Sequence, residues 1–151
     1  MVNDIGSFLQ EHLDHMVAET LLQEVAGLRE LGHKVEIIES DGVINLVIED
    51  FPLPPYYNKK STTLLLRLPV SYPNGNPDMF WTDADLMRLD GQVPTKADQI
   101  ETYSGKQWRR FSWHPQGWKP GTNNLCMYLE FVSNGLNYAG KNKYIQAQNF
   151  T

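Results

Sequence analysis

The pattern of apolar positions at the start of the chain is helical. From roughly Ser7 to Leu31, apolar residues recur at intervals of three and four, which predicts an amphipathic helix with one buried face. These positions are Leu9, Leu13, Met16, Leu21, Val25, Leu28 and Leu31. Ser7 and Gln10 form a capping-box pattern, although the imperfect spacing also allows a start near Asp14. Gly32 is the expected C-terminal stop.

The pattern then changes to β-rich runs. VEIIES and VINLVIEDF flank Asp41-Gly42, a dipeptide that favours a two-residue hairpin turn. The run FPLPP, from Phe51 to Pro55, is expected to break the ladder, because proline lacks an amide donor. TTLLLRLPV predicts a third strand that ends at Pro69. A helix followed by a three-strand meander indicates an α+β fold, with the helix packed on an antiparallel sheet.

The middle of the chain shows little periodicity. The stretch from Tyr72 to Trp81 contains prolines, asparagines and a glycine, and we expect regular structure there only as a brief fourth strand at Met79-Phe80-Trp81. Residues Thr82 to Trp113 are expected to form a long ordered loop, pinned by aromatic side chains. Ordered loops of this length in a small domain are usually functional.

Apolar positions at helical spacing return near Asn123. Four of them lie at i, i+4, i+7 and i+11, which predicts a C-terminal helix with one buried face. They are Leu125, Leu129, Val132 and Leu136. Thr122, Asn123 and Asn124 are the candidate N-caps. The whole chain, 1–151, is expected to be one α+β domain with a four-stranded antiparallel meander and a frayed polar tail from about residue 140.

Charge and aromatic content bear on possible macromolecular partners. The chain has 18 acidic and 13 basic residues, a net charge of -5, which is the wrong sign for a general binder of phosphate backbones. Trp108-Arg109-Arg110-Phe111 interleaves bases with aromatics as a base-stacking platform would. The acidic balance favours the other interpretation, in which these rings anchor the long loop to the core. We therefore expect no nucleic-acid partner.

Several classes of site and location are excluded or disfavoured. The chain shows no secretory signal and no apolar run long enough to span a bilayer, so a cytoplasmic protein is expected. Cys126 is the single cysteine, which excludes an internal disulfide and a thiolate zinc site. His12 and His15 lack a third ligand, and solvated histidines are the expected interpretation. There is no phosphate-binding loop and no GxSxG elbow, so no cofactor is expected.

Cys126 has two interpretations. It lies near the expected N-terminus of the last helix, where unpaired N–H groups and partial positive charge favour a nucleophilic thiolate. The side-chain amides of Asn123 and Asn124 can donate to a developing oxyanion. Cys126 is also flanked by Leu125 and Met127, so it can equally be a small core residue.

The order of these features resembles the ubiquitin-conjugating enzyme fold. A helix and a meander precede Tyr72-Pro73-Asn74-Gly75-Asn76-Pro77, then His114-Pro115, then Leu125-Cys126-Met127. More specifically, the chain resembles prokaryotic ubiquitin-conjugating enzyme family E. The similarity runs from about Phe8 to Leu136 through the segments DFPLP, LLLRLPVSYP, NPDMFW, LDGQVP, WRRFSWH and GWKPGTNNL. Each segment is weak alone, and their order makes the match fairly specific.

The resemblance implies a covalent chemistry centred on Cys126. An activating enzyme would pass the C-terminal glycine of a ubiquitin-like protein to Cys126 as a thioester, and an acceptor nucleophile such as a lysine would then attack it. The resemblance also implies an operon-encoded deconjugating protease as a further partner. The implied catalytic residues are Cys126, His114, Asn124 and Gln116. The implied binding and loop-shaping residues are Tyr72, Pro73, Pro77, Pro115 and Trp118.

Two departures from the family pattern leave alternatives open. The usual His-Pro-Asn ends here in Gln116, and the stretch from His114 to Cys126 is slightly longer than usual. Gln116, Asn123 or Asn124 can serve as the oxyanion donor, and a general base among the loop carboxylates Asp90, Asp98 and Glu101 is not assigned. A catalytically silent module that binds a ubiquitin-like protein is the alternative within the fold. An unrelated aromatic-lined binding domain is the alternative outside it.

Overall fold

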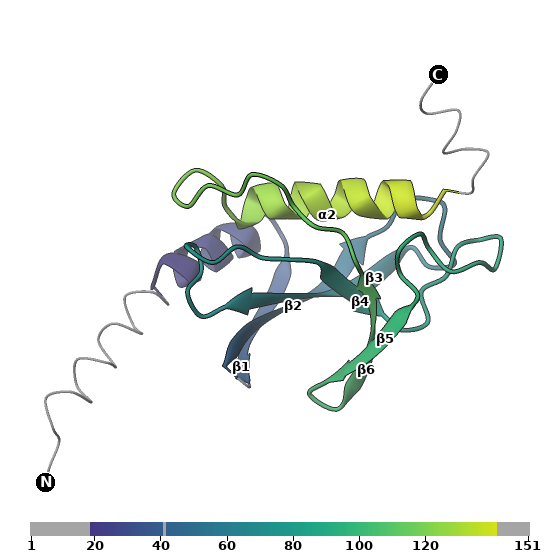
Figure 1. The fold of residues 1–151 in the computed structure, drawn as a ribbon, viewed down its shortest axis with the longest axis horizontal. Helices are drawn as coiled ribbons and strands as arrows, with labels where there is room; N and C mark the ends of the chain where they lie inside the picture. Colours follow the sequence, from purple (N-terminus) through teal and green to yellow (C-terminus); the bar gives the residue numbers. More distant parts are fainter. Residues whose placement is uncertain (1–18, 41, 142–151) are drawn as a thin grey trace, which may run out of the picture.

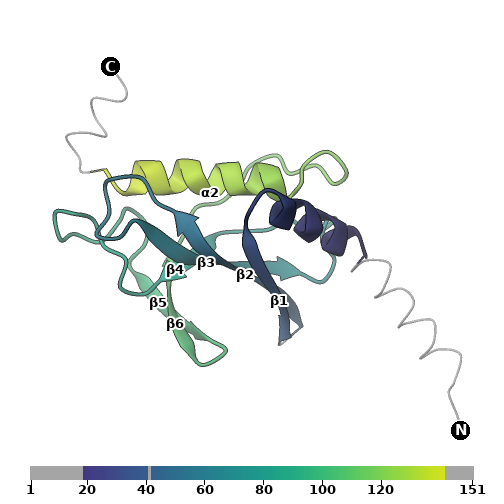
Figure 2. The same ribbon diagram turned by 180° about the vertical axis from the view of Figure 1, so that it is seen from behind.

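The computed structural model describes residues 19–40 and 42–141. Six strands form one antiparallel sheet with the spatial order β1-β2-β3-β4-β6-β5. In chain order they are β1 (Lys34–Ser40), β2 (Val43–Pro52), β3 (Ser61–Pro69), β4 (Phe80–Asp83), β5 (Gln99–Tyr103) and β6 (Lys106–Phe111). The helix at residues 19–30 and α2 (Leu125–Ala139) lie on the same side of the sheet (Figure 1 and Figure 2). The α+β class is confirmed.

The N-terminal helix ends where the sequence predicted. Gly32 adopts φ 98°, the left-handed conformation that favours glycine, and its amide donates to the carbonyl of Arg29 at 3.0 Å. The amide of His33 donates to the carbonyl of Leu28 at 3.1 Å. These two bonds form a Schellman motif, which ends the helix and fixes the backbone of His33 beside it.

The buried face of this helix is confirmed only in part. Leu21, Val25 and Leu28 are buried, as the periodicity predicts. Leu31 was expected on the same face, but it is 68% exposed because it lies in the turn after the last helical residue. The earlier apolar positions, the Ser7–Gln10 capping box, the alternative start near Asp14 and the two histidines at 12 and 15 lie outside the described residues.

The β1–β2–β3 meander is confirmed. Ser40 pairs with Val43 across a two-residue connection, as the Asp-Gly dipeptide predicted. The proline run was expected to break the ladder from Phe51, but β2 continues through Pro52, which pairs with Ser61. A proline is tolerated there because β1 pairs with β2 only as far as Glu49, so Pro52 interrupts no ladder on that side.

The predicted four-stranded sheet is wrong, because the sheet has six strands. The expected fourth strand is present as β4, but the region from Thr82 to Trp113 is not one loop. It contains the β5–β6 hairpin, whose turn residues Ser104 and Gly105 have φ of 52° and 74°. β5 is exposed and intermediate along its length, so it lacks the buried alternation by which a strand is found in a sequence.

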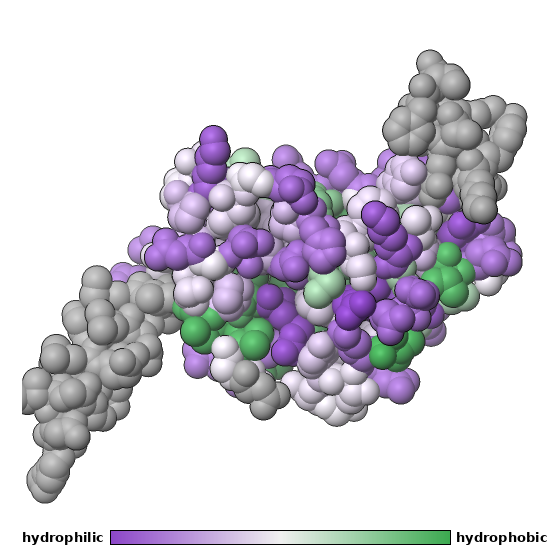
Figure 3. Space-filling model, viewed as in Figure 1, coloured by the Kyte–Doolittle hydropathy of each residue, from purple (hydrophilic) through white to green (hydrophobic). Residues whose placement is uncertain are grey.

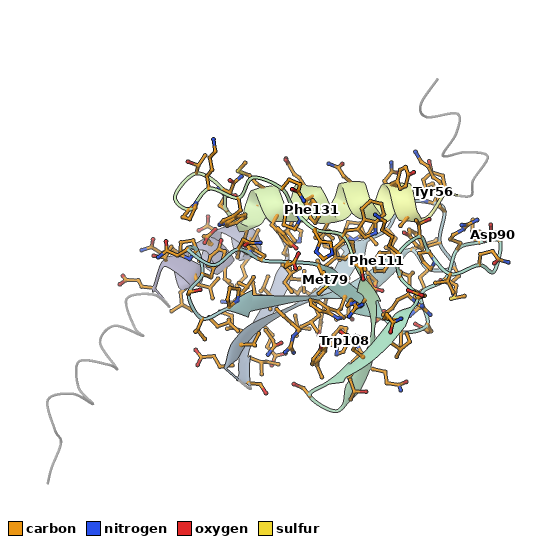
Figure 4. All side chains as sticks on the ribbon, in the orientation of Figure 1. Tyr56, Met79, Asp90, Trp108, Phe111 and Phe131 are labelled. Carbon is orange, nitrogen blue, oxygen red and sulfur yellow. The ribbon has the colours of Figure 1, made fainter. Side chains whose placement is uncertain are left out.

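The main core lies between the sheet and the two helices. Strands β2 and β3 direct alternate side chains to this face, because successive residues of a strand point to opposite faces. All four apolar residues predicted for the last helix are buried in it. A smaller cluster on the other face contains Leu65, Trp81 and Trp108. Figure 4 shows Trp108 on the side of the sheet away from α2, with Phe111 toward the helix.

Buried side chains pin the segment between β4 and β5. The guanidinium of Arg109 is buried and donates to the carbonyls of Ala97 at 2.7 Å and Ala84 at 3.1 Å. The indole of Trp113 donates to the carbonyl of Thr95 at 3.3 Å. Trp108, Arg109 and Phe111 are all buried, which agrees with the anchoring interpretation that the acidic charge favoured over a stacking platform.

Neither helix in the described part of the chain is long and apolar enough to cross a membrane. The face of the molecule in Figure 3 is largely hydrophilic, with small, separate apolar areas. The tail that was expected to fray lies almost entirely outside the described residues, which end at residue 141.

Candidate functional site

The turn after β3 is tied to the N-terminal helix by Tyr72. Its ring is buried, and its hydroxyl donates to the two carboxylate oxygens of Glu24 at 2.9 and 2.8 Å. Burial, followed by the hydrogen bond to Glu24 and its charge, raises the pKa of the Tyr72 hydroxyl well above its ordinary value. The Tyr72 hydroxyl therefore stays protonated and acts as a hydrogen-bond donor. The peptide bond between Tyr72 and Pro73 is cis.

Trp118 ties the segment before α2 to the same turn. Its indole N–H donates to the carbonyl of Pro73 at 2.8 Å. Its ring lies against Tyr72 and Tyr128, with centroid distances of 5.9 and 6.4 Å. The Tyr128 hydroxyl donates to the carbonyl of Met79 at 2.6 Å. One aromatic cluster therefore positions the start of α2 against the turn after β3.

Among the first four backbone amides of α2, all but one donate a hydrogen bond. Asn124 is the N-cap, and its side-chain oxygen accepts from the amide of Met127 at 2.9 Å. Glu24 accepts from the amide of Leu125 at 2.9 Å, and the Asn124 carbonyl accepts from the amide of Tyr128 at 3.0 Å. The amide of Cys126 has no partner among the described residues. It is therefore free to donate to a bound group.

Cys126 is exposed, so the interpretation of it as a core residue is wrong. As the second residue of α2, it lies where two grooves meet. The apolar groove, of about 360 Å³, is lined by Glu24, Gly27, Leu28, Leu31, Asn124 and Cys126. The His33 groove, of about 540 Å³, is lined by His33, Phe51, Pro52, Cys126, Leu129, Glu130, Ser133 and Asn134.

His114 and Gln116 belong to a different surface. The imidazole Nδ1 of His114 lies 2.7 Å from a carboxylate oxygen of Asp78, and both side chains are exposed. Gln116 and Pro115 line a third groove, of about 280 Å³, with Trp118, Met127 and Phe131. Glu130 and Asn134 line both this groove and the His33 groove, so they form the ridge between them. Neither groove that contains Cys126 contains His114 or Gln116.

A comparison with protein families shows the family of this chain. A family model described as prokaryotic E2 family E matches residues 21–139. The chain belongs to this family. No curated protein and no solved structure matches it. Membership of prokaryotic E2 family E indicates a ubiquitin-conjugating-like protein and, in general terms, an E2-type function with a ubiquitin-like protein and an activating enzyme as partners.

The residues that the resemblance nominated fall into two groups in this E2-family chain. Tyr72, Pro73 and Trp118 form one cluster below the start of α2, and Asn124 caps the turn that contains Cys126. His114, Pro115 and Gln116 lie in the segment before α2. Pro115 and Gln116 line the third groove, and His114 lies beside Asp78. Pro77 is buried in the turn that precedes β4.

The three loop carboxylates considered as general bases are not gathered at Cys126. Figure 4 shows Asp90 at the opposite end of the molecule from the start of α2, where it pairs with Arg88. Asp98 is exposed and comes directly before β5. Glu101 lies with Trp81 on the uncovered face of the sheet. Although burial raises it, hydrogen bonds from Trp81 and Tyr103 and the charge of Arg110 hold the pKa of Glu101 below its ordinary value.

Two residues at the site were missed by sequence reasoning. Glu24 joins the N-terminal helix to Tyr72 and to the first amide of α2, and His33 lines a groove with Cys126. Glu24 could have been noticed as an acidic residue between the buried positions Leu21 and Leu28. His33 was missed because its proximity to α2 depends on the tertiary fold.

Proposed function

We propose that this protein is an acyl carrier of the ubiquitin-conjugating type, with Cys126 as its nucleophile. Cys126 would accept the C-terminal acyl group of a ubiquitin-like protein from an activating enzyme and pass it to an acceptor. One observation carries the proposal. In a chain of prokaryotic E2 family E, the single thiol is exposed on the first turn of a helix, beside an unpaired amide, where two grooves meet.

The first step would be an exchange between thioesters. The Cys126 thiol loses its proton to solvent, and the thiolate attacks the carbonyl carbon of the thioester on the activating enzyme. A new carbon–sulfur bond forms, the old one breaks, and the electron pair leaves with the thiolate of the activating enzyme. The activating enzyme consumes the ATP, so this chain needs no nucleotide for the step.

The tetrahedral intermediate would be stabilised by two donors on the first turn of α2. The amide of Cys126 has no partner among the described residues, and it is attached to the nucleophile itself. The side-chain oxygen of Asn124 is engaged with Met127, which leaves the amide nitrogen of the same side chain to donate outward. Preorganised donors of this kind stabilise the charge that develops on the carbonyl oxygen. They would take the part considered for Gln116, which lines neither of the two grooves that contain Cys126.

A charging assay tests the proposal. The protein is incubated with ATP, the activating enzyme and the ubiquitin-like protein, and the products are separated on a gel without reductant. We expect an adduct that disappears when a thiol reductant is added. Binding of the ubiquitin-like protein without an adduct, under conditions that charge the activating enzyme, would favour the catalytically silent module instead.

Replacement of Asn124 separates its capping role from its role as a donor. Asn124→Ser retains a good N-cap acceptor but loses the amide donor, so the free energy of unfolding is expected to change by less than about 0.5 kcal/mol. The rate of charging in a single turnover is expected to fall roughly 100- to 1000-fold, because one oxyanion donor is lost. Urea denaturation and quenched-flow gels measure the two quantities.

Asn124→Ala provides the matched control, because it removes both the cap and the donor. It should lose charging rate as Asn124→Ser does and also about 1 kcal/mol of stability. An Asn124→Ser protein that charges at the rate of the unmodified protein would show that Asn124 is only a cap. The deconjugating protease implied by the resemblance and the cytoplasmic location expected from the sequence stay predictions.

A further inference from the structure

The His33 groove places two ionisable side chains, His33 and Glu130, in one groove with Cys126. His33 lies on one wall, beside Phe51 and Pro52, and Glu130 lies on the α2 wall with Cys126. The apolar groove on the other side contains Glu24, but the carboxylate oxygens of Glu24 already accept from Tyr72 and Leu125. The side chains of the His33 groove are therefore the candidates for handling a proton at the thioester.

His33 is held in place by its surroundings. Its amide is the last donor of the Schellman motif that ends the N-terminal helix, bonded to Leu28 at 3.1 Å. Leu28 itself lines the apolar groove with Cys126. The imidazole ring is stacked on Phe51, with centroids 6.3 Å apart and an interplanar angle of 19°. The ring is therefore oriented by packing, and its nitrogens have no hydrogen-bond partner among the described residues.

Glu130 gives the same groove a negative charge. It lies one helical turn after Cys126, on the same edge of α2, and its side chain is exposed. No ion pair of Glu130 is present within the described part of the chain. An unpaired carboxylate beside a thioester attracts a cationic acceptor such as the ammonium group of a lysine.

We propose that the His33 groove receives the acceptor amine, with His33 as the general base for its attack and Glu130 as the group that attracts it. The proposal rests on the proposed function. The ammonium group first loses a proton to solvent, and the neutral amine then attacks the carbonyl carbon of the Cys126 thioester. A carbon–nitrogen bond forms, and the carbon–sulfur bond breaks. The electron pair leaves with the Cys126 thiolate, and the extra proton on nitrogen passes to the imidazole of His33. Histidine is the side chain that most often performs this task.

The test uses the charged full-length protein and two nucleophiles, free lysine and hydroxylamine. Hydroxylamine is uncharged at neutral pH and is a strong nucleophile, so it depends little on a base or on Glu130. His33→Gln retains a polar side chain of similar size but cannot act as the base. We expect it to charge normally, to react normally with hydroxylamine, and to react with lysine at least about 10-fold more slowly.

Two further measurements distinguish a base from a packing residue. Imidazole added to His33→Ala should restore part of the rate with lysine, which a merely structural role would not allow. Glu130→Gln should raise the lysine concentration needed for half-maximal rate while leaving the maximal rate and the hydroxylamine reaction unchanged. Equal losses with both nucleophiles, or an unchanged rate with lysine in His33→Gln, would overturn the inference while the thioester itself still forms. Failure of the unmodified protein to form a thioester would instead overturn the proposed function.

Discussion

Replacement of Cys126 with alanine is expected to abolish the thiol-sensitive adduct completely, because the chain has no second thiol to take its place. The fold should be unaffected. Cys126 is exposed on the first turn of α2, and alanine has the highest helix propensity, so the free energy of unfolding should change by less than about 0.5 kcal/mol. Gels without reductant measure the adduct, and urea denaturation measures the stability.

Two matched variants sharpen this result. Cys126→Ser should form an adduct that survives reductant, because an ester replaces the thioester, although it should form more slowly. Asn137→Ala changes another exposed residue of the same helix, about three turns away, and should charge like the unmodified protein. A thiol-sensitive adduct that persisted in Cys126→Ala would contradict the assignment of the nucleophile.

Removal of the Glu24 carboxylate is expected to cost about 2–4 kcal/mol of unfolding free energy, since leaving a buried donor unpaired typically costs about 1–3 kcal/mol. Glu24→Ala would leave two such donors, the hydroxyl of Tyr72 and the amide of Leu125, and both residues are buried. The start of α2 would lose its attachment to the N-terminal helix. Thermal or urea denaturation measures the loss.

The controls for Glu24 separate hydrogen bonding from charge. Glu24→Gln retains an oxygen that can accept from both donors, so its loss should be smaller, about 1 kcal/mol. Glu30→Ala removes an exposed carboxylate of the same helix and should change the stability by less than about 0.5 kcal/mol. If Glu24→Ala were as stable as Glu30→Ala, the bridge would contribute nothing to the fold.

The parts of the fold that were predicted are those in which local pattern and burial agree. The apolar face of α2 and the Asp-Gly hairpin depend on neighbours within a few residues, so the sequence reveals them. The β5–β6 hairpin was missed because its strands are short and β5 has no buried residue to produce an alternation. Its Ser104-Gly105 turn was the one signal available.

The candidate site divides in the same way. The proximity of Cys126 to a helix N-terminus follows from an asparagine cap and a helical pattern, and it was predicted. The separation of Gln116 from Cys126 was not predicted, because eight residues of irregular backbone (117–124) lie between Gln116 and the start of α2. Their path depends on tertiary contacts such as the packing of Trp118 on Tyr72. For the same reason the sequence could not decide whether Gln116, Asn123 or Asn124 is the oxyanion donor.

Periodicity, capping residues and one unpaired thiol were enough to establish an α+β class, a nucleophile candidate and a resemblance to a family, because these are properties of short segments read in order. The exposure of Cys126, the bridge made by Glu24 and the position of His33 depend on contacts between segments up to 101 residues apart. Such contacts are decided by how two helices share one face of a sheet, and no local pattern records that arrangement.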